Sequence, residues 1–567
     1  MLRRLVGSAP SALLRARPAA LRTCIPAALA GSVRHQHLIP NPSKDLTQDE
    51  LASAEDNGGL LRFLMREGKW HDVKDKVAIR CSTNGFKGLT YGELEGRISA
   101  AAHALRAQGF EQGDCINLHL HNCEQFIVAF FATAALGGRV STSNPVYTAA
   151  ELANQQIDAG CKFVISSHAY DDVIGAAVAK SQITNVSFVE DATCFANAPA
   201  TDLPLPPLLR PIDPREDIVA LPYSSGTTGR PKGVMLTHHN MTTNTLQCRG
   251  GVDVERDDVL VGVLPLFHIY GMTVLMMYSL MRQAELVLLA KFDPQPFLEA
   301  LSQQRVTVGF LVPPIILFLA KHPLVQQYDL SALRYIFSGA APLDGATQQT
   351  LSEQLGIPLL QGWGMTELSP IGTVSPYDKP TVNGSAGALV GSTEGMIVDP
   401  ETGASLPPGA EGELLIRGPQ VMKGYLGRAD ATAETIRPDG FLRTGDLAYH
   451  DDAGNVFLVD RLKELIKVKG LQVAPAEIEG RLLEIEELAD AAVIGIPDER
   501  AGQLPKAYCV KKPDAAISEE AVRERLSATL APYKIPAQIE FIDAIPKSAS
   551  GKILRRHLMA QSTAQAA

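Results

Sequence analysis

The sequence predicts an α/β protein with a large N-terminal domain and a small C-terminal domain of α+β character. Two observations lead to this prediction. The chain has 567 residues, more than one hydrophobic core normally supports. From residue 49 onward, short apolar segments typical of strands alternate with segments whose apolar residues recur at helical spacing. Such alternation is typical of sheets with largely parallel strands.

In the large domain the clearest predicted helix covers residues 91–108, where Leu94, Ile98 and Leu105 fall on one face. A second helix is predicted at 124–136, and a proline-rich loop at 201–214. Buried strands are predicted at 115–120, 163–166 and 186–189. The apolar segment 308–320 is interrupted by two prolines, so it predicts a strand and a helix start; a membrane span needs about 18 apolar residues.

A second unit is predicted to begin near Asp460 and Arg461. Pro475 opens a helix that extends to residue 485, and Ser518 caps a further helix that extends to residue 530. Strands are predicted at 489–496 and 539–542. The predicted domain plan is a transit peptide at 1–44, the large domain at 45–459, a hinge at 460–461, the small domain at 462–560 and a tail at 561–567.

Composition excludes some classes of function. The formal net charge of −10 argues against a general nucleic-acid binder, which needs clustered Lys and Arg. None of the eight cysteines forms a C-x-x-C pair, so neither a zinc ribbon nor a dithiol redox site is predicted.

The first 44 residues differ from the rest, with six arginines and no acidic residue before Asp45. Arginines punctuate the segment throughout, which is typical of a mitochondrial presequence rather than a secretory signal. A disordered basic tail is the alternative. The last residues, Thr563 to Ala567, lack the S-K-L peroxisomal signal, so we expect a mitochondrial protein.

The strongest local signal is the segment 223–234, with the sequence YSSGTTGRPKGV. Its glycines allow the backbone to approach a ligand closely. Four hydroxyls and Lys232 offer donors to phosphate oxygens. Gly and not Ser or Thr follows Lys232, so this is not a Walker loop. The segment predicts a polyphosphate-binding loop, with a polar surface turn as the alternative.

Six further segments follow in a fixed order: 361–367, 412–418, 444–447, 460–464, 467–473 and 546–552. Together with 223–234 they resemble the signatures of the adenylate-forming superfamily, which includes acyl-CoA synthetases, 4-coumarate–CoA ligases, luciferases and adenylation domains. The resemblance covers about residues 50–558. The segment 473–477, VAPAE, is most similar to that of the 4-coumarate–CoA ligase-like acyl-CoA ligases.

The resemblance implies a large multi-sheet adenylate-forming domain and a small mobile C-terminal domain. It implies an AMP-forming acid–thiol ligase that uses ATP, Mg²⁺ and coenzyme A to convert a carboxylic acid into an acyl-adenylate and then a thioester. Both steps build negative charge, which fixed donors and a metal ion stabilise.

The resemblance also implies residue roles. Glu367 holds Mg²⁺, Thr366 contacts the α-phosphate and Lys552 serves adenylation. His268 is a gate between the acyl pocket and the thiol tunnel, and Lys467 and Gln472 complete the catalytic set. The implied nucleotide and coenzyme A contacts are Ser224, Ser225, Gly226, Thr227, Thr228, Gly229, Lys232, Ala340, Gln361, Gly362, Trp363, Thr366, Asp446, Arg461, Lys463, Lys469 and Gly470.

The implied acyl pocket consists of Tyr270, Val274, Ala340, Gly362, Pro370 and Ile371. Coumarate ligases often have a small polar residue at the position of Val274, and a valine cannot hydrogen-bond a ring hydroxyl. A medium-chain fatty acid or an unsubstituted aryl acid is therefore expected as substrate. A luciferase-type oxygenase and a non-catalytic nucleotide-binding protein are the alternatives, and the presence of Glu367 and Lys552 argues against the second.

Overall fold

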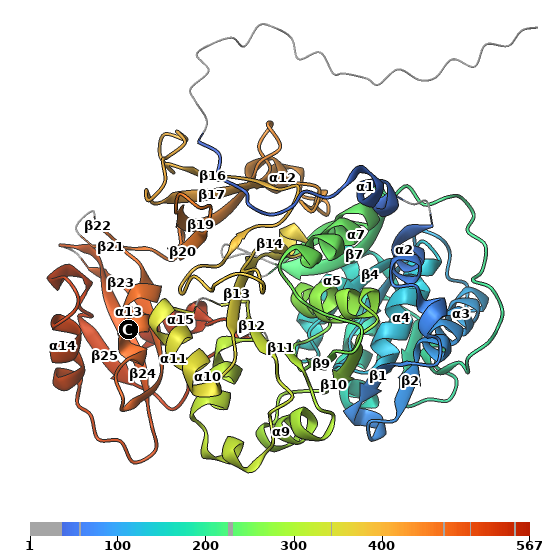
Figure 1. Ribbon diagram of the computed structural model, residues 1–567, viewed down its shortest axis with the longest axis horizontal. Coiled ribbons are helices and arrows are strands. Elements are labelled where there is room, and N and C mark those ends of the chain that lie inside the picture. The colour runs from blue at the N-terminus through green and yellow to red at the C-terminus, as the bar shows by residue number, and fades with distance from the viewer. Residues whose placement is uncertain are drawn as a thin grey trace, which may run out of the picture. The chain divides into compact units, whose positions relative to one another are not determined.

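The computed structural model describes residues 37–55, 58–224, 231–341, 343–468, 471–498, 500–548 and 551–566 (Figure 1). These residues form four β-sheets with helices packed around them. Nearly all of the predicted transit peptide lies outside the described residues, so its prediction stays a prediction. None of the described helices is both long and apolar enough to cross a membrane.

The first sheet has seven strands in the order β18-β8-β7-β4-β3-β5-β6. The strands are β3 (Cys115–Leu118), β4 (Arg139–Thr142), β5 (Cys161–Ser166), β6 (Asn185–Phe188), β7 (Ile218–Ser224), β8 (Lys232–Thr237) and β18 (Gly424–Tyr425). Strands β3 to β7 are parallel, as the sequence predicted, whereas β8 returns antiparallel to β7 and β18 pairs antiparallel with β8. The segment 223–234 therefore joins the two strands of a hairpin.

The second sheet has nine strands in the order β15-β14-β13-β12-β11-β9-β10-β1-β2. They are β1 (Val77–Cys81), β2 (Gly88–Thr90), β9 (Val259–Gly262), β10 (Glu285–Leu288), β11 (Val308–Leu311), β12 (Tyr335–Ser338), β13 (Leu359–Gly364), β14 (Ile371–Val374) and β15 (Ala388–Leu389). The strands from β1 to β13 in this order are parallel. Their carboxyl ends consequently lie at one edge, where α/β sheets bind ligands.

The third sheet differs from the predicted parallel arrangement. Its strands are β16 (Glu394–Val398), β17 (Gly412–Arg417), β19 (Leu442–His450) and β20 (Val456–Arg461), and all pair antiparallel. The sequence between 390 and 461 contains strands joined by turns with few helical residues, which favours hairpins over crossover connections. Strand β20 ends at Arg461, the second residue of the predicted hinge.

The small domain has a sheet of its own, formed by β21 (Ile466–Val468), β22 (Leu471–Val473), β23 (Leu488–Asp498), β24 (Gly502–Lys511) and β25 (Gln538–Phe541). The predicted strands at 489–496 and 539–542 correspond to β23 and β25. A separate hydrophobic cluster, which includes Ile478, Val493 and Leu526, packs between this sheet and its helices. The largely antiparallel pairing of its strands gives this region the α+β character that was predicted.

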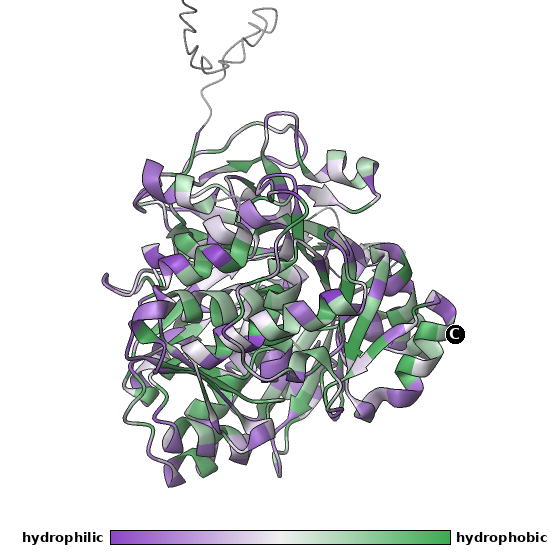
Figure 2. Ribbon diagram, turned by 90° about the vertical axis from the view of Figure 1, so that its right-hand side faces the viewer, coloured by the Kyte–Doolittle hydropathy of each residue, from purple (hydrophilic) through white to green (hydrophobic). Residues whose placement is uncertain are grey.

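The described α-helices are α1 (Gln48–Ala54), α2 (Gly59–Glu67), α3 (Tyr91–Ala107), α4 (Glu124–Ala135), α5 (Ala149–Ala159), α6 (Asp171–Ser181), α7 (His238–Gln247), α8 (Tyr278–Met281), α9 (Pro294–Gln303), α10 (Pro313–Lys321), α11 (Gly345–Leu355), α12 (Ala429–Thr435), α13 (Pro475–Leu483), α14 (Glu519–Ser527) and α15 (Arg555–Ala566). Capping boxes begin several of them, such as Thr90 with Glu93 at α3. Hydrophobic residues are concentrated in the strands between the helices (Figure 2).

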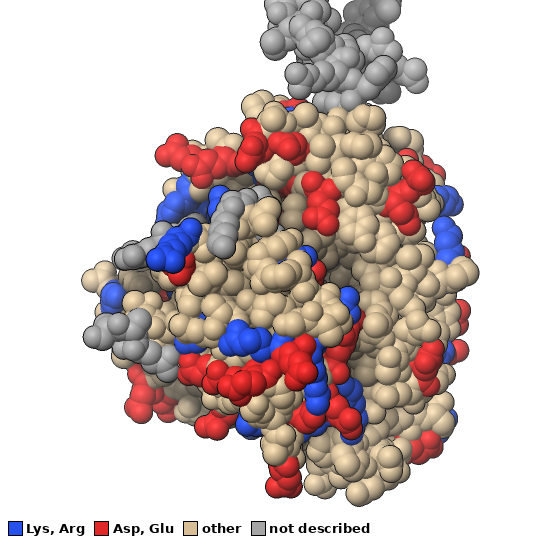
Figure 3. Space-filling model, turned by 90° about the vertical axis from the view of Figure 1, so that its left-hand side faces the viewer, with Lys and Arg blue, Asp and Glu red and all other residues tan. Residues whose placement is uncertain are grey.

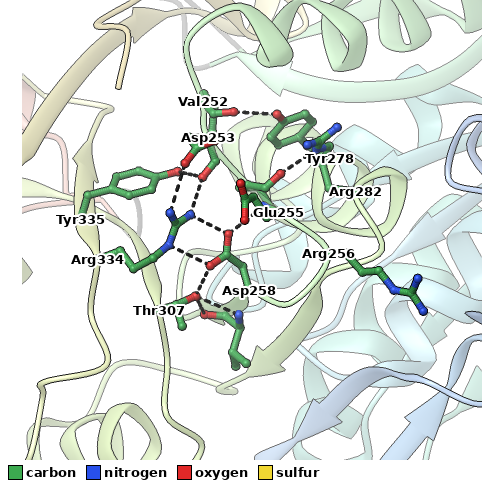
Figure 4. Close-up of polar contacts among 12 residues, drawn as sticks. Val252, Asp253, Glu255, Arg256, Asp258, Tyr278, Arg282, Thr307, Arg334 and Tyr335 are labelled. Atoms are coloured by element: carbon green, nitrogen blue, oxygen red, sulfur yellow. Dashed lines mark hydrogen bonds and ion pairs between the residues drawn. The ribbon is translucent and has the colours of Figure 1, made fainter. Parts of the chain in front are cut away.

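At the amino ends of the second sheet, Arg334 is the centre of a polar network (Figure 4). Its Nε and one terminal nitrogen donate to the two oxygens of Asp258 at 3.0 and 2.8 Å. Thr307 donates to the same carboxylate at 2.7 Å. Asp258, Thr307 and Arg334 directly precede β9, β11 and β12, so the network ties three neighbouring strands together where they begin.

Charged side chains are mixed on the face that carries the small domain. Among the described residues on this face, Lys and Arg alternate with Asp and Glu and form no continuous basic patch (Figure 3). Ion pairs such as Arg525 with Glu487 and Lys534 with Glu477 lie in this domain. This distribution agrees with the acidic net charge of the chain.

Candidate active site

The predicted site residues gather at the carboxyl edge of the second sheet. Ser338 ends β12 and Ala340 follows it. Thr366 and Glu367 follow β13 in a short 3-10 helix, η8 (Thr366–Leu368), and His268 follows β9. Because these strands are parallel neighbours or close to one another in the sheet, segments far apart in the sequence meet at one place.

The loop after β12, residues 338–340, has features that are typical of a ligand site. The Oγ of Ser338 is buried and has no hydrogen-bond partner among the described residues. Ala340 has a φ of 71°, a left-handed conformation that is costly for a residue with a Cβ atom. A Cβ on Gly339 would lie 3.0 Å from the Tyr270 ring. An unpaired hydroxyl and a strained backbone are features that cluster at ligand sites.

Trp363, Asp446 and Arg461 form a connected group. The indole Nε1 of Trp363 donates to Asp446 at 2.8 Å, and the Nε of Arg461 lies 3.2 Å from the other carboxylate oxygen. Burial raises the pKa of Asp446, while Arg461 and the indole N–H act to lower it. A carboxylate offers about four lone-pair sites, so Asp446 keeps acceptor capacity for a ligand.

Glu367 is buried, with 6% of its surface exposed. The hydroxyl of Tyr425 donates to its Oε1 at 2.8 Å, and the backbone N–H of Met422 donates to the Glu367 carbonyl at 2.9 Å. The Nζ of Lys232 lies 4.6 Å from the centre of the Tyr425 ring. Tyr425 therefore contacts both a carboxylate and a lysine of the predicted set.

Lys552 belongs to the small domain, but its electrostatic partners belong to several elements. Burial lowers its pKa and Arg461 adds to this effect, whereas Asp446, Glu367 and Glu464 raise it. Burial and the charge of Lys552 lower the pKa of His268 to about 3, so this imidazole is neutral at physiological pH. The structure thus brings Lys552 close to the predicted nucleotide and metal residues.

The predicted acyl-pocket residues lie beside this group. Tyr270 precedes and Val274 lies within a π-helix, η6 (Gly271–Met277), a rare element that is frequent at functional sites. Val274 is buried. A Cβ on Gly362 would lie 2.5 Å from the Phe337 ring, so only glycine leaves this ring in place. Pro370 and Ile371 are also buried, at the turn into β14.

Two side chains that were not predicted hold the backbone of the segment 369–371, which contains two of the predicted acyl-pocket residues. Asn244 on α7 accepts a hydrogen bond from the Ile371 N–H at 3.0 Å and donates to the Ile371 carbonyl at 2.9 Å. Thr273 in η6 donates to the Ser369 carbonyl at 2.7 Å. Tyr425 was missed as well. All three act through partners distant in the sequence, and the only available signal was the Gly-Tyr pair that follows the 412–418 motif.

Some predicted residues are used differently or lie outside the described part. The Gln361 amide donates to Leu343 and Gln348 at 2.9 and 2.7 Å, so its side chain supports α11. Lys463 and Lys467 are exposed. Ser225, Gly226, Thr227, Thr228, Gly229, Lys469 and Gly470 lie outside the described residues, as does the Gln472 side chain. Ser224 and Lys232 face each other at the base of the β7–β8 hairpin.

Comparison with known proteins identifies the family of the chain. Residues 67–426 match the model of the AMP-binding enzyme family, and residues 477–552 match that of the AMP-binding enzyme C-terminal domain. The chain therefore belongs to the AMP-binding enzyme family, as the motifs predicted. Within it, the chain is an adenylate-forming, AMP-forming acid–thiol ligase of the 4-coumarate–CoA ligase-like group.

Relatives of established identity cover most of the chain. The chain is 40% identical to 4-coumarate-CoA ligase 1 of Narcissus pseudonarcissus over 515 residues, which are 87% of this chain and 92% of that protein. ATP-bound MatB from Rhodopseudomonas palustris is 31% identical, with a TM-score of 0.79 and coverage of 87% and 98%. The o-succinylbenzoate CoA synthetase of Bacillus subtilis, in complex with its acyl-adenylate, is 27% identical, with a TM-score of 0.75 and coverage of 87% and 97%.

Proposed function

We propose that this ATP-dependent acyl-CoA ligase activates a medium-chain fatty acid or an unsubstituted aryl acid, with the residues at the carboxyl edge of the second sheet in the roles given below. The observation that carries the proposal is the convergence of Lys552 with Glu367 and Asp446. A cation whose charge interacts with two buried carboxylates suits a site where a polyphosphate loses pyrophosphate and negative charge develops.

In the first step a carboxylate oxygen of the substrate attacks the α-phosphorus of ATP, and the bond to the β-phosphate breaks with release of pyrophosphate. Lys552 donates to the oxygens on which charge builds. Asp446 accepts hydrogen bonds from the ribose hydroxyls, and the Trp363 ring stacks on adenine. The indole N–H of Trp363 holds Asp446 at 2.8 Å, so the base and ribose contacts are positioned together.

Glu367 fits a magnesium ion shared with phosphates. Mg²⁺ is typically held by one or two carboxylates together with phosphate oxygens and water, and among the described residues no cluster of three or more His, Cys, Asp or Glu forms a dedicated metal cage. The ion supplies neutralisation of the phosphate charge when bound. Thr366 next to Glu367 offers a hydroxyl to the α-phosphate, and Lys232 offers a further cation to the phosphates.

In the second step the sulfur of coenzyme A attacks the acyl carbonyl, AMP leaves with the electron pair of the C–O bond, and the thiol proton passes to solvent. The neutral His268 stands between the acyl pocket and the thiol approach. Lys463 and Lys467 are exposed on the small domain, and with Gln472, Lys469 and Gly470 they are the residues assigned to the thiol substrate. Asp460 and Arg461 serve as the pivot that exchanges these residues for Lys552.

The substrate class is tested by a pyrophosphate-release assay with a panel of fatty and aryl acids. The buried Val274 offers no hydrogen bond to a phenol, which costs a hydroxylated ring about 1–3 kcal/mol. Octanoate or cinnamate should therefore exceed 4-coumarate in kcat/KM, and Val274→Ser should narrow the difference. A clear preference of the unmodified protein for 4-coumarate contradicts the proposal.

The arginine-rich start motivates a mitochondrial location. Residues 1–44 fused to a fluorescent reporter should direct it to mitochondria, and the same fusion with the six arginines replaced by glutamine should stay in the cytosol. A diffuse cytosolic signal from the unaltered fusion contradicts this part of the proposal.

A further inference from the structure

Tyr425 stands between two residues of the adenylation site that come from different sheets. Tyr425 is buried, with 7% of the residue exposed. The hydroxyl donates to Glu367, which follows β13 in the second sheet. The ring lies under the Nζ of Lys232, which begins β8 in the first sheet. Tyr425 therefore contacts a predicted metal ligand and a predicted phosphate ligand at once. The sequence motifs did not indicate either contact.

The backbone around Tyr425 is fixed to the same two places. Strand β18 pairs Tyr425 with Val234 of the hairpin, and the N–H of Leu426 donates to the Gly233 carbonyl at 2.9 Å. On the preceding side, the N–H of Met422 donates to the Glu367 carbonyl at 2.9 Å. Residues 422–426 therefore form a strap that holds the phosphate hairpin and the Glu367 loop at a constant separation.

A second contact braces the strap. Arg428 forms an ion pair with Asp158 at 2.7 Å, and the other oxygen of Asp158 accepts a hydrogen bond from Tyr223 at 2.8 Å. Tyr223 begins the segment 223–234, and its ring lies against Gly233, where a Cβ would be 3.1 Å away. The two ends of the hairpin are thus connected to the residues just after Tyr425.

We propose that Tyr425 is a positioning residue for adenylation: its hydroxyl orients the Glu367 carboxylate toward the metal and its ring orients Lys232 toward the phosphates. This inference rests on the proposed function, because it assumes that Glu367 binds Mg²⁺. Groups that hydrogen-bond a metal ligand fix its orientation, and their loss typically weakens metal binding by about 10–100-fold. A cation over an aromatic ring is held more weakly.

Two substitutions separate the two contacts. Tyr425→Phe keeps the ring under Lys232 and removes the hydrogen bond to Glu367. Tyr425→Leu removes both. Tyr335→Phe is the matched control, because it also deletes a buried hydroxyl, which donates to the Asp253 carbonyl at 2.8 Å, but at the opposite end of the second sheet.

The test is calorimetric binding of α,β-methylene-ATP, which cannot release pyrophosphate, with and without Mg²⁺. In Tyr425→Phe, we expect the factor by which Mg²⁺ raises the affinity for the analogue to be about tenfold smaller than in the unmodified protein. The affinity measured without Mg²⁺ should be unchanged. Tyr425→Leu should in addition lose about threefold of the Mg²⁺-free affinity. Tyr335→Phe should match the unmodified protein, and all three variants should retain its circular dichroism spectrum.

The outcomes distinguish a failure of the inference about Tyr425 from a failure of the proposed function. If the unmodified protein shows Mg²⁺-dependent binding and Tyr425→Phe shows the same dependence, the inference about Tyr425 is wrong and the proposed function stands. An equal loss with and without Mg²⁺ in Tyr425→Phe also overturns it, since the residue then has only a structural role. If the unmodified protein binds the analogue equally in both conditions, the proposed metal role of Glu367 fails, and the inference fails with it.

Discussion

Two buried carboxylates, each paired with an arginine, serve different purposes in this molecule. Asp258 accepts four hydrogen bonds: two from Arg334, one from Thr307 and one from the Glu255 N–H. Asp446 accepts one bond from Trp363 and has a single 3.2 Å contact with Arg461. The first has used its acceptor capacity, whereas the second keeps part of it and has its pKa raised by burial.

The difference follows from where the two groups lie. Asp258 precedes β9 at the amino ends of the second sheet, where the network in Figure 4 joins the starts of three strands. Asp446 lies beside the residues at the carboxyl ends, together with Glu367 and Lys552. Complete pairing indicates a structural role, and incomplete pairing of buried groups indicates a place for a ligand.

The largest expected effect comes from Asp446→Ala. It removes the proposed acceptor of the ribose hydroxyls, so kcat/KM for ATP in pyrophosphate release should fall by about 10²–10³. The free energy of unfolding should change by less than about 1 kcal/mol, because Arg461 is exposed enough to be solvated. Asp258→Ala is the control and should give the opposite pattern. Similar losses of activity in both variants contradict the comparison.

Arg334→Met tests the structural role of the network at the amino ends of the second sheet. It leaves the Asp258 carboxylate buried without its cation, and we expect the free energy of unfolding to fall by about 2 kcal/mol, less than for a fully buried pair because Arg334 is 31% exposed. Measured by urea unfolding, this should come with unchanged kcat and KM well below the transition. Restored stability in Arg334→Lys is not expected, since lysine lacks the two-pronged geometry.

Features of the fold that depend on residues close together in the sequence could be predicted, and features that depend on distant residues could not. The helices at 91–108 and 124–136 and three strands of the first sheet, β3, β5 and β6, were predicted to within a few residues, because apolar periodicity and capping are local. The ordered motifs also located Glu367, Asp446, Arg461 and Lys552. The antiparallel third sheet was not predicted, since pairing depends on contacts between distant segments.

Side-chain partnerships were the least predictable part. Nothing in the sequence indicated that Trp363 would donate to Asp446 across 83 residues, or that Tyr425 would reach Glu367 across 58. Asn244, which forms hydrogen bonds with the backbone of Ile371, is one polar residue among many on α7. Such roles become visible only when the fold brings the partners together.

A buried histidine with an unpaired ring nitrogen should make the stability of the protein depend on pH. His238 is buried and its Nδ1 accepts a hydrogen bond from the Leu60 N–H. Its Nε2 has no partner among the described residues, and burial lowers its pKa to about 4. The unfolded chain takes up a proton near pH 6.5 and the folded one does not, so stability is present above pH 6.5 and is lost as the pH falls toward 4. From pH 7 to 5 the cost is about 2 kcal/mol.

This pH effect is measured by denaturant unfolding at pH 7 and pH 5. His238→Gln should be less stable overall but show a shallower decline between the two pH values than the unmodified protein. An unchanged slope in the variant assigns the acid sensitivity to other buried histidines, such as His239 and His119, whose pKa values are also lowered to about 4.

The smallest effect is expected from Ala340→Gly. Glycine adopts a φ of 71° without the penalty paid by alanine, so thermal unfolding should show a gain of up to about 1 kcal/mol. Added flexibility in unfolded glycine offsets part of this gain. If the variant is destabilised, the left-handed backbone at Ala340 carries no strain that glycine relieves.

The most direct test of the account follows the two half-reactions separately in Lys552→Ala. Acyl-adenylate formation, measured as pyrophosphate release, should slow by about 10²–10³, the usual effect of removing one preorganised donor. Given preformed acyl-adenylate and coenzyme A, the same variant should make thioester at a near-normal rate. Equal impairment of both half-reactions contradicts the claim that the small domain brings Lys552 to the carboxyl edge for adenylation alone.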